Sequence, residues 1–87
     1  MEVRKIDEAS VYCGIPSEII LFFIHEDWIN PLDIDTPTFD GEDIARIELI
    51  WELRNELGVN DEAMPIILNL IDQLILIQLE LEKNYVH

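Results

Sequence analysis

Basic residues are scarce in this sequence. It contains five Lys and Arg but 19 Asp and Glu among 87 residues, so its formal net charge is -14. No Lys or Arg occurs from Ile6 to Ala45. Contacts to nucleic-acid phosphates need Lys and Arg donors, and anionic membrane surfaces attract basic segments. The composition therefore argues against binding to nucleic acid or to an anionic membrane.

Cysteine and long apolar runs are also scarce. Cys13 is the only cysteine, so the chain cannot form a disulfide within itself, and nothing indicates an oxidising compartment. The N-terminus is not followed by an apolar signal segment, and no uninterrupted apolar run approaches the ~18–20 residues that span a bilayer. We therefore expect a soluble, unprocessed, cytoplasmic protein.

The chain lacks the motifs of common active sites. It has no Gly-rich phosphate loop and no triad pattern, and 19 acids in so short a chain make close carboxylate pairs uninformative. Consecutive His25, Glu26 and Asp27 would point in different directions from a helix, which is unsuitable for shared metal coordination. Cys13 is predicted to be a small core residue without a base to activate it. We expect no enzymatic activity, no metal and no cofactor.

Size and apolar content favour one domain that self-associates. A single domain of 87 residues buries only about 60% of the surface of its unfolded chain. Hydrophobic residues nevertheless make up 49% of the sequence, so we expect contacts with a second copy. The predicted single domain, 1–87, comprises a helix-turn-helix with a wing (1–40), a third helix (41–58) and a long C-terminal helix (60–84).

Turn and cap signals predict a mainly all-α order of elements. Asp7 is predicted to cap a short helix over residues 8–13, which Gly14 ends in the left-handed conformation. Pro16 and Ser17 open a second helix, because proline fits the first helical turn and serine can cap. The two helices together form a helix-turn-helix pair.

Proline and aspartate interrupt the next stretch of the chain. Leu32, Ile34 and Phe39 alternate weakly with polar residues between the prolines. This pattern is typical either of a short two-stranded wing or of an irregular loop.

The third helix is predicted from its cap and its apolar spacing. Asp40 is the predicted N-cap, Glu42 and Arg46 form a favourable i, i+4 pair, and Gly58 is a natural C-cap. The apolar residues recur at helical spacing: Ile47, Ile50, Trp51, Leu53 and Leu57.

The C-terminal helix is apolar on most of its circumference. Asn60 or Asp61 is predicted to cap it, with Pro65 so late in the first turn that the start can shift onward. One apolar stripe is heptad-like and the second lies beside it: Ile67, Leu70, Leu74, Ile77 and Leu81, and then Leu68, Ile71, Ile75 and Leu79. We expect one stripe to cover the domain's own core and the other to meet a second copy. The predicted dimerisation residues are Ile67, Leu70, Ile71, Leu74, Ile77 and Leu81.

This order of elements resembles the winged helix-turn-helix of the MerR family. The resemblance covers nearly the whole chain, from the turn at Gly14–Pro16 to the segment Phe39–Ile44 that leads the third helix. Within that plan, Leu53–Gly58 and Ile67–Leu74 resemble the CbpM family, small bacterial modulators of J-domain co-chaperones.

The resemblance to CbpM implies a homodimer joined through the C-terminal helix. Such a dimer binds the J-domain of a CbpA-like, DnaJ-related co-chaperone and inhibits its action with Hsp70. J-domains present a basic helix to Hsp70, so an acidic competitor is electrostatically reasonable. MerR regulators typically carry arginines in the second helix at the positions held here by Glu18 and Leu21, and a basic wing where this chain has Asp33 and Asp35. The DNA-contacting residues are therefore absent.

An acidic surface is the predicted binding site for the partner. It comprises Glu18, His25, Glu26, Asp27, Trp28, Asp33 and Asp35. Trp28 is included as an aromatic anchor of the kind that is enriched at interfaces. Three alternatives stay open: a solvated face that only keeps the protein soluble, a diverged MerR-type transcriptional regulator, and a dimeric adaptor for another basic protein.

Overall fold

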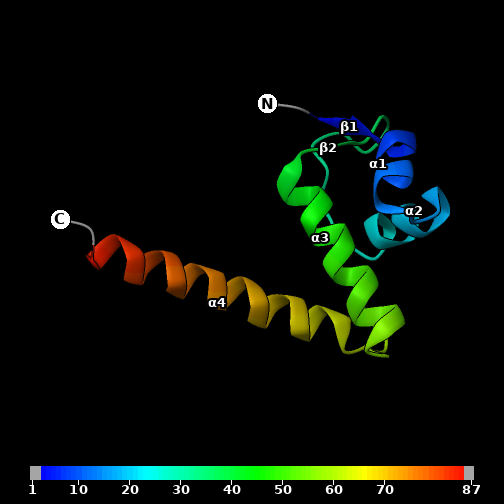
Figure 1. Ribbon diagram of the computed structural model, residues 1–87. Helices are drawn as coiled ribbons and strands as arrows, with labels where there is room; N and C mark the ends of the chain where they lie inside the picture. Colours follow the sequence, from blue (N-terminus) through cyan, green and yellow to red (C-terminus); the bar gives the residue numbers. More distant parts are fainter. Residues whose placement is uncertain (1–2, 86–87) are drawn as a thin grey trace.

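Four α-helices and a two-stranded sheet make up the computed structural model, which describes residues 3–85 (Figure 1). Residues 4–56 form a rounded head, and one long helix extends away from it (Figure 1). The mainly helical class predicted from the sequence is confirmed.

The first two helices form the predicted helix-turn-helix. Helix α1 spans Ile6–Cys13 and α2 spans Ser17–His25. Gly14 adopts the left-handed conformation with φ 69°, as its position after the helix predicts. The Ser10 hydroxyl donates a hydrogen bond of 2.6 Å to the carbonyl of Ile15, which fixes the turn.

Both predicted N-caps of this pair are wrong. Helix α1 starts two residues earlier than expected, with Lys5 at the N-cap and Asp7 already in the first turn. The Glu8 carboxylate accepts from the Lys5 amide at 3.0 Å, which satisfies one free N–H without Asp7. Pro16 occupies the N-cap of α2, so the Ser17 side chain caps nothing.

The wing is not a hairpin in the part of the chain that the structure describes. Strand β2, Thr38–Phe39, pairs antiparallel with the N-terminal strand β1, Arg4–Lys5, and Phe39 lies opposite Arg4. Residues 30–37 form an irregular loop, which was one of the two predicted alternatives. The prolines in this loop lack an N–H and so cannot continue a ladder.

Helix α3, Gly41–Trp51, begins as the sequence predicts. The Asp40 carboxylate accepts from the Asp43 amide at 2.9 Å, and the Asp43 carboxylate accepts from the Asp40 amide at 3.1 Å. This reciprocal pair is a capping box with aspartate at both ends. The predicted Glu42–Arg46 pair is wrong, because the Arg46 side chain bonds to two other elements that are described below.

A short π-helical segment, η1 (Glu52–Glu56), continues α3. Gly58 then turns the chain with φ 69°, and the amide of Val59 donates to the carbonyl of Leu53 at 2.9 Å. This bond satisfies a carbonyl of the π-helical segment, and the left-handed glycine makes the turn, as its position predicts.

The core of the head lies among α1, α2, β2 and α3. Twelve buried hydrophobic residues form it: Ala9, Ile15, Ile20, Phe23, Trp28, Ile29, Phe39, Ile44, Ile47, Ile50, Met64 and Leu68. Trp51 and Leu53 pack against this cluster while partly exposed, whereas Leu57 is 68% exposed. The predicted core face of the third helix is therefore confirmed at Ile47 and Ile50 but not at Leu57.

Helix α4, Met64–Tyr85, starts late and leaves the head early. The Asn60 side chain accepts from the Ala63 amide at 2.8 Å, and the helix begins only at Met64, just before Pro65. Among residues 64–84 of this helix, only Met64 and Leu68 are buried. The radius of gyration is 14.3 Å, whereas a compact domain of this length has about 12 Å. The extended helix accounts for the difference (Figure 1).

The expectation that one stripe of α4 covers the protein's own core is therefore largely wrong. Of that stripe Leu68 is buried and Ile71 half-buried, but Ile75 and Leu79 are 50% and 55% exposed. The head is too short to reach along the helix, so both stripes extend beyond it.

The absence of an uninterrupted apolar run did not exclude a membrane-spanning helix. By length and composition, Met64–Asn84 could cross a bilayer, and only 11% of its most apolar stretch is buried within the protein. This property has two physical explanations, a bilayer or a protein partner around the helix, and the polar side chains of α4 bear on the choice.

Candidate protein-interaction surfaces

The exposed face of α2 is the surface that a helix-turn-helix would present to a ligand. Glu18, Leu21 and His25 are exposed and lie three and four residues apart, so they share one face of the helix. We call these three residues the recognition face. Its only acid is Glu18, its only possible cation is His25, and it carries neither Lys nor Arg.

The carboxyl end of α2 adds two further predicted site residues to this face. Glu26 and Asp27 are exposed, and His25 Nδ1 lies 3.8 Å from Glu26 Oε1, an ion pair only when the histidine is protonated. Asp27 has φ 62°, a left-handed conformation in which aspartate is tolerated. It ends the helix, and the chain then turns back toward the head.

Trp28 is not a surface anchor, which corrects its predicted role. It is 2% exposed, and its ring packs edge-on against Phe22 and at a tilt against Phe23, with 5.5 and 5.7 Å between the ring centroids. The turn at Asp27 brings the indole under α2, where it belongs to the core. Loss of such a buried ring would cost about 3–5 kcal/mol of stability, so Trp28 holds the surface in place and does not bind through it.

Asp33 and Asp35 lie in the loop between α2 and β2. The Asp33 carboxylate accepts from the amide and the hydroxyl of Thr36, at 3.4 and 2.9 Å, and from the amide of Asp35 at 2.9 Å. These bonds, with the hydroxyl bond the strongest cause, lower the pKa of Asp33 below its ordinary value. The loop thus has a defined shape although it lies on the surface.

Two apolar residues of this loop were missed as site residues. Leu32 is fully exposed and Ile34 is 76% exposed. Their alternation with Asp33 and Asp35 was compatible with a strand of a short wing or with an irregular loop, and in the structure they lie in an irregular loop where neither side chain joins the core. The signal was present, because apolar and acidic residues alternate inside a segment bounded by prolines.

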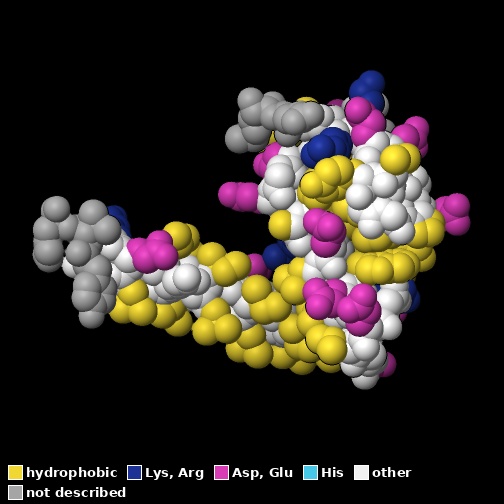
Figure 2. Space-filling model, in the orientation of Figure 1, with side chains coloured by type: hydrophobic (Ala, Val, Ile, Leu, Met, Phe, Trp, Pro, Cys, Tyr) yellow, Lys and Arg dark blue, Asp and Glu magenta, His cyan; other side chains and the backbone are white. Residues whose placement is uncertain are grey.

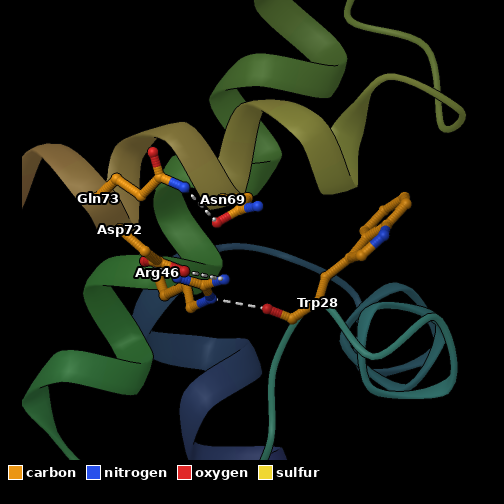
Figure 3. Close-up of polar contacts among 5 residues, drawn as sticks. All are labelled: Trp28, Arg46, Asn69, Asp72 and Gln73. Carbon is orange, nitrogen blue, oxygen red and sulfur yellow. Dashed lines mark hydrogen bonds and ion pairs between the residues drawn. The ribbon is translucent and has the colours of Figure 1, made fainter.

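Arg46 is occupied by contacts within the molecule. Its Nε donates to the backbone carbonyl of Trp28 at 2.7 Å, and its Nη1 and Nη2 donate to the two carboxylate oxygens of Asp72 at 2.9 and 3.4 Å. Figure 3 shows the guanidinium between α3 and α4, with the Trp28 ring pointing away from it. This tie fixes the base of α4 to the head.

The other basic residues offer little to a polyanion. Arg54 pairs with Asp61 at 2.8 Å and lies 5.0 Å from the Phe22 ring centroid, and Arg4 lies 4.1 Å from the Tyr12 ring centroid. Lys5 and Lys83 are exposed but lie on β1 and near the end of α4. None of the five projects from the recognition face.

Cys13 and the acids form no recognisable reactive or metal site. Cys13 is half-buried, and burial is the main cause that raises the pKa of its thiol, with Glu48 adding to the effect. Within residues 3–84 no three His, Cys, Asp or Glu side chains lie close enough to hold a metal ion.

The predicted dimerisation residues lie along α4, mostly beyond the head. Ile67 and Ile71 are half-buried against it. The remaining four are more than half exposed: Leu70 at 55%, Leu74 at 65%, Ile77 at 54% and Leu81 at 54%. Figure 2 shows hydrophobic side chains along most of the visible face of this helix. A surface of this kind is rarely left uncovered in a soluble protein.

A shallow cleft lies between α3 and the apolar stripe of α4 that begins at Leu68. It is lined by Leu49, Ile71, Ile75 and Leu79, with the Arg46–Asp72 pair at its polar edge. The cleft is apolar and open, so it extends the uncovered surface of α4 and does not form a separate site.

The comparisons with known proteins agree with this geometry. A family model described as MerR HTH family regulatory protein matches residues 5–83 of the chain. The match runs from the N-terminal strand through the helix-turn-helix and α3 to the last turns of α4. No curated protein matches the chain significantly.

Proposed function

Since this chain belongs to the MerR helix-turn-helix family of regulatory proteins, we propose that it regulates through a protein partner and not through DNA. Its partner is the J-domain of a CbpA-like or DnaJ-like co-chaperone, and binding inhibits the action of that co-chaperone with Hsp70. The protein is a cytoplasmic homodimer that needs neither a cofactor nor catalytic groups.

The recognition face of α2 carries this proposal. A helix-turn-helix that reads DNA places donors for phosphates and bases on its second helix. Here that face consists of Glu18, Leu21 and His25, and Glu26 and Asp27 follow it directly. Duplex DNA would meet carboxylates at the point of closest approach, which costs free energy instead of supplying it.

The exposed acids of α2 and of the loop that follows it suit a basic protein. Glu18, Asp27, Asp33 and Asp35 make no ion pair within the described residues, so their charges are available to a partner. A J-domain presents a basic helix, and complementary charges accelerate encounter and exclude wrong partners. These features support a J-domain, and they equally suit an adaptor for another basic protein, which the binding experiment separates.

Helix α4 supports a dimer in preference to a membrane anchor. Asp72 of this helix is ion-paired to Arg46 of the head, and Asn69 and Gln73 are hydrogen-bonded to each other at 3.4 Å (Figure 3). Polar groups of this kind are costly in the hydrocarbon of a bilayer. A second α4 can cover the apolar stripes and leave these polar groups in water.

Isothermal titration calorimetry of the full chain against an isolated CbpA-type J-domain tests the function. We expect saturable binding at low salt that weakens as salt rises, because acidic–basic attraction is then screened. The charge reversal Glu26→Lys with Asp27→Lys should weaken binding, mainly through slower association. The reversal of two exposed acids far along α4, Glu80→Lys with Glu82→Lys, is the matched control. Absence of binding at low salt would remove the J-domain from the proposal.

Family membership favours one second candidate, a DNA-binding transcriptional regulator. This candidate requires a mobility shift of a specific duplex that persists in the presence of competitor DNA. The net charge of -14 and the acidic recognition face oppose it.

A further inference from the structure

The loop between α2 and β2 contains two apolar side chains that the protein itself does not use. We propose that Leu32 and Ile34 are the anchors through which this protein binds its partner. Each enters an apolar pocket on the partner that has Lys or Arg at its edge. This inference rests on the proposed function and identifies the residues that supply most of its binding free energy. We call residues 32–36 the anchor loop.

The exposure of these two side chains is the first argument. Leu32 is fully exposed and Ile34 is 76% exposed, although they are separated by a single residue. Single exposed aliphatic residues are common on protein surfaces, but two large ones at a loop tip are typical of contact sites. Neither side chain belongs to the core of the head, so stability of the head does not explain them.

The shape of the anchor loop is the second argument. Asp33 accepts three hydrogen bonds, two from Thr36 and one from Asp35, which hold the backbone between the two apolar residues. Phe39 and Ile29, on either side of the loop, are buried and attach its ends to the core. A loop ordered before binding loses less conformational entropy on docking, so more of the contact free energy is retained.

The charges of the anchor loop indicate what kind of partner it binds. Asp33 and Asp35 alternate with the two apolar residues and are exposed. Their carboxylates would border any pocket that Leu32 and Ile34 enter, and desolvation there is tolerated only opposite positive charge. The pocket must therefore lie in a basic partner. A second copy of this chain, itself at -14, would repel the loop, so the anchor loop is separate from the dimer contact of α4.

The anchor loop supplies the apolar contact that the sequence had assigned to Trp28. Trp28 is buried and cannot serve as the anchor of the acidic surface. Charged rims mostly set association rates, whereas buried apolar side chains set dissociation rates. With Trp28 in the core, Leu32 and Ile34 are the exposed large apolar side chains that alternate with acids in the loop.

The test compares three full-length proteins for binding to an isolated CbpA-type J-domain by surface plasmon resonance. They are the unchanged chain, the double variant Leu32→Ser with Ile34→Ser, and the control Val11→Ser. Val11 is 84% exposed on α1, so the control removes an equally exposed aliphatic side chain outside the anchor loop. Circular dichroism should give the same spectrum for all three, because none of these side chains is in the core.

We expect the double variant to raise Kd by at least about tenfold, since burial of two aliphatic side chains contributes this much even after partial compensation. The change should lie in the dissociation rate, and the dependence of Kd on salt should be unchanged because every charge remains. Val11→Ser should alter Kd less than about twofold. Equal Kd values for the double variant and the unchanged chain would overturn the anchor loop alone. Absence of binding by the unchanged chain would overturn the J-domain proposal and, with it, this inference.

Discussion

Arg46 joins three parts of the molecule. From α3 it donates to the Trp28 carbonyl at the end of α2 and to the Asp72 carboxylate on α4. The sequence predicted only a local pair with Glu42, because helical spacing reveals neighbours on the same helix and not the approach of another helix. The orientation of α4 relative to the recognition face therefore depends on a contact that no local pattern contains.

We predict that Arg46→Met destabilises the protein more than Asp72→Asn does. Loss of the arginine leaves the Trp28 carbonyl without its donor and costs about 1–3 kcal/mol. Loss of the Asp72 charge removes only an ion pair that is partly solvated, which costs less than about 1 kcal/mol. Urea unfolding of the two variants measures both values. Equal destabilisation would show that the carbonyl contact contributes nothing.

Asp33 gives a prediction for pH at the same scale. Its hydrogen bonds favour the charged carboxylate and lower its pKa, so the turn is fully formed above the ordinary pKa of aspartate. The turn is lost as the pH falls through the lowered pKa. Thr36→Val removes the hydroxyl donor and should raise the pKa of Asp33 toward its ordinary value, which an NMR titration of the side-chain carboxyl carbon measures.

The control for that titration is Thr38→Val. The Thr38 hydroxyl makes no side-chain hydrogen bond within residues 3–84, so the pKa of Asp33 should stay unchanged. Identical titration curves for the Thr36 and Thr38 variants would contradict the proposed turn.

At the scale of elements, the sequence predicted helix ends better than helix starts. Gly14 and Gly58 both adopt the left-handed conformation that their positions imply, because few other residues can. Asp7 and Ser17 failed as caps because neighbouring residues took the N-cap positions. Lys5, paired with Glu8, is the N-cap of α1, and Pro16 is the N-cap of α2. The capping box at Asp40 succeeded because no such competitor precedes it.

The turn at Gly58 directs the chain from η1 toward α4. We predict that Gly58→Ala lowers the free energy of unfolding of the protein by about 1–2 kcal/mol. No atom lies within 4 Å of the position a Cβ would take, so the cost comes from the positive φ alone. Gly41→Ala is the matched control, because Gly41 also has free space but no positive φ. It should be neutral or slightly stabilising in thermal unfolding. Similar losses for both glycines would contradict this explanation.

Surface positions were the least predictable elements of the candidate site. The acids Glu18, Glu26, Asp27, Asp33 and Asp35 are exposed as charge alone suggests, whereas Trp28 is buried and Leu32 and Ile34 are exposed. Hydrophobicity predicts burial on average, but the direction of the chain after Asp27 decides which side chain reaches the core. That direction results from a left-handed aspartate, which sequence patterns do not reveal.

At the scale of the whole molecule, the long helix carries most of the exposed large apolar side chains. Helix α4 extends beyond the head and exposes aliphatic side chains on both stripes (Figures 1 and 2). The amount of apolar sequence predicted a partner for this helix. It could not predict how little of the helix the head covers, because that depends on where the turn after η1 points α4.

We predict that Leu74→Asp produces a folded monomer. Leu74 is 65% exposed in the protomer, so a charge there is harmless to the head but is buried without a partner in the dimer. Sedimentation equilibrium should show a dimer for the unchanged chain and a monomer for this variant, with an unchanged near-ultraviolet spectrum. Leu68→Asp, at a buried position, should instead unfold the head. A stable monomer of the unchanged chain at micromolar concentration would contradict the dimer.

The most direct test of the central claim, that this MerR-family protein binds a basic protein and not DNA, is one fluorescence anisotropy experiment at low salt. The full-length protein is titrated in parallel into a labelled CbpA-type J-domain and into labelled fragments of genomic DNA. We predict saturable binding to the J-domain and no rise in anisotropy with the DNA. Saturable binding to the DNA, with none to the J-domain, would contradict the claim.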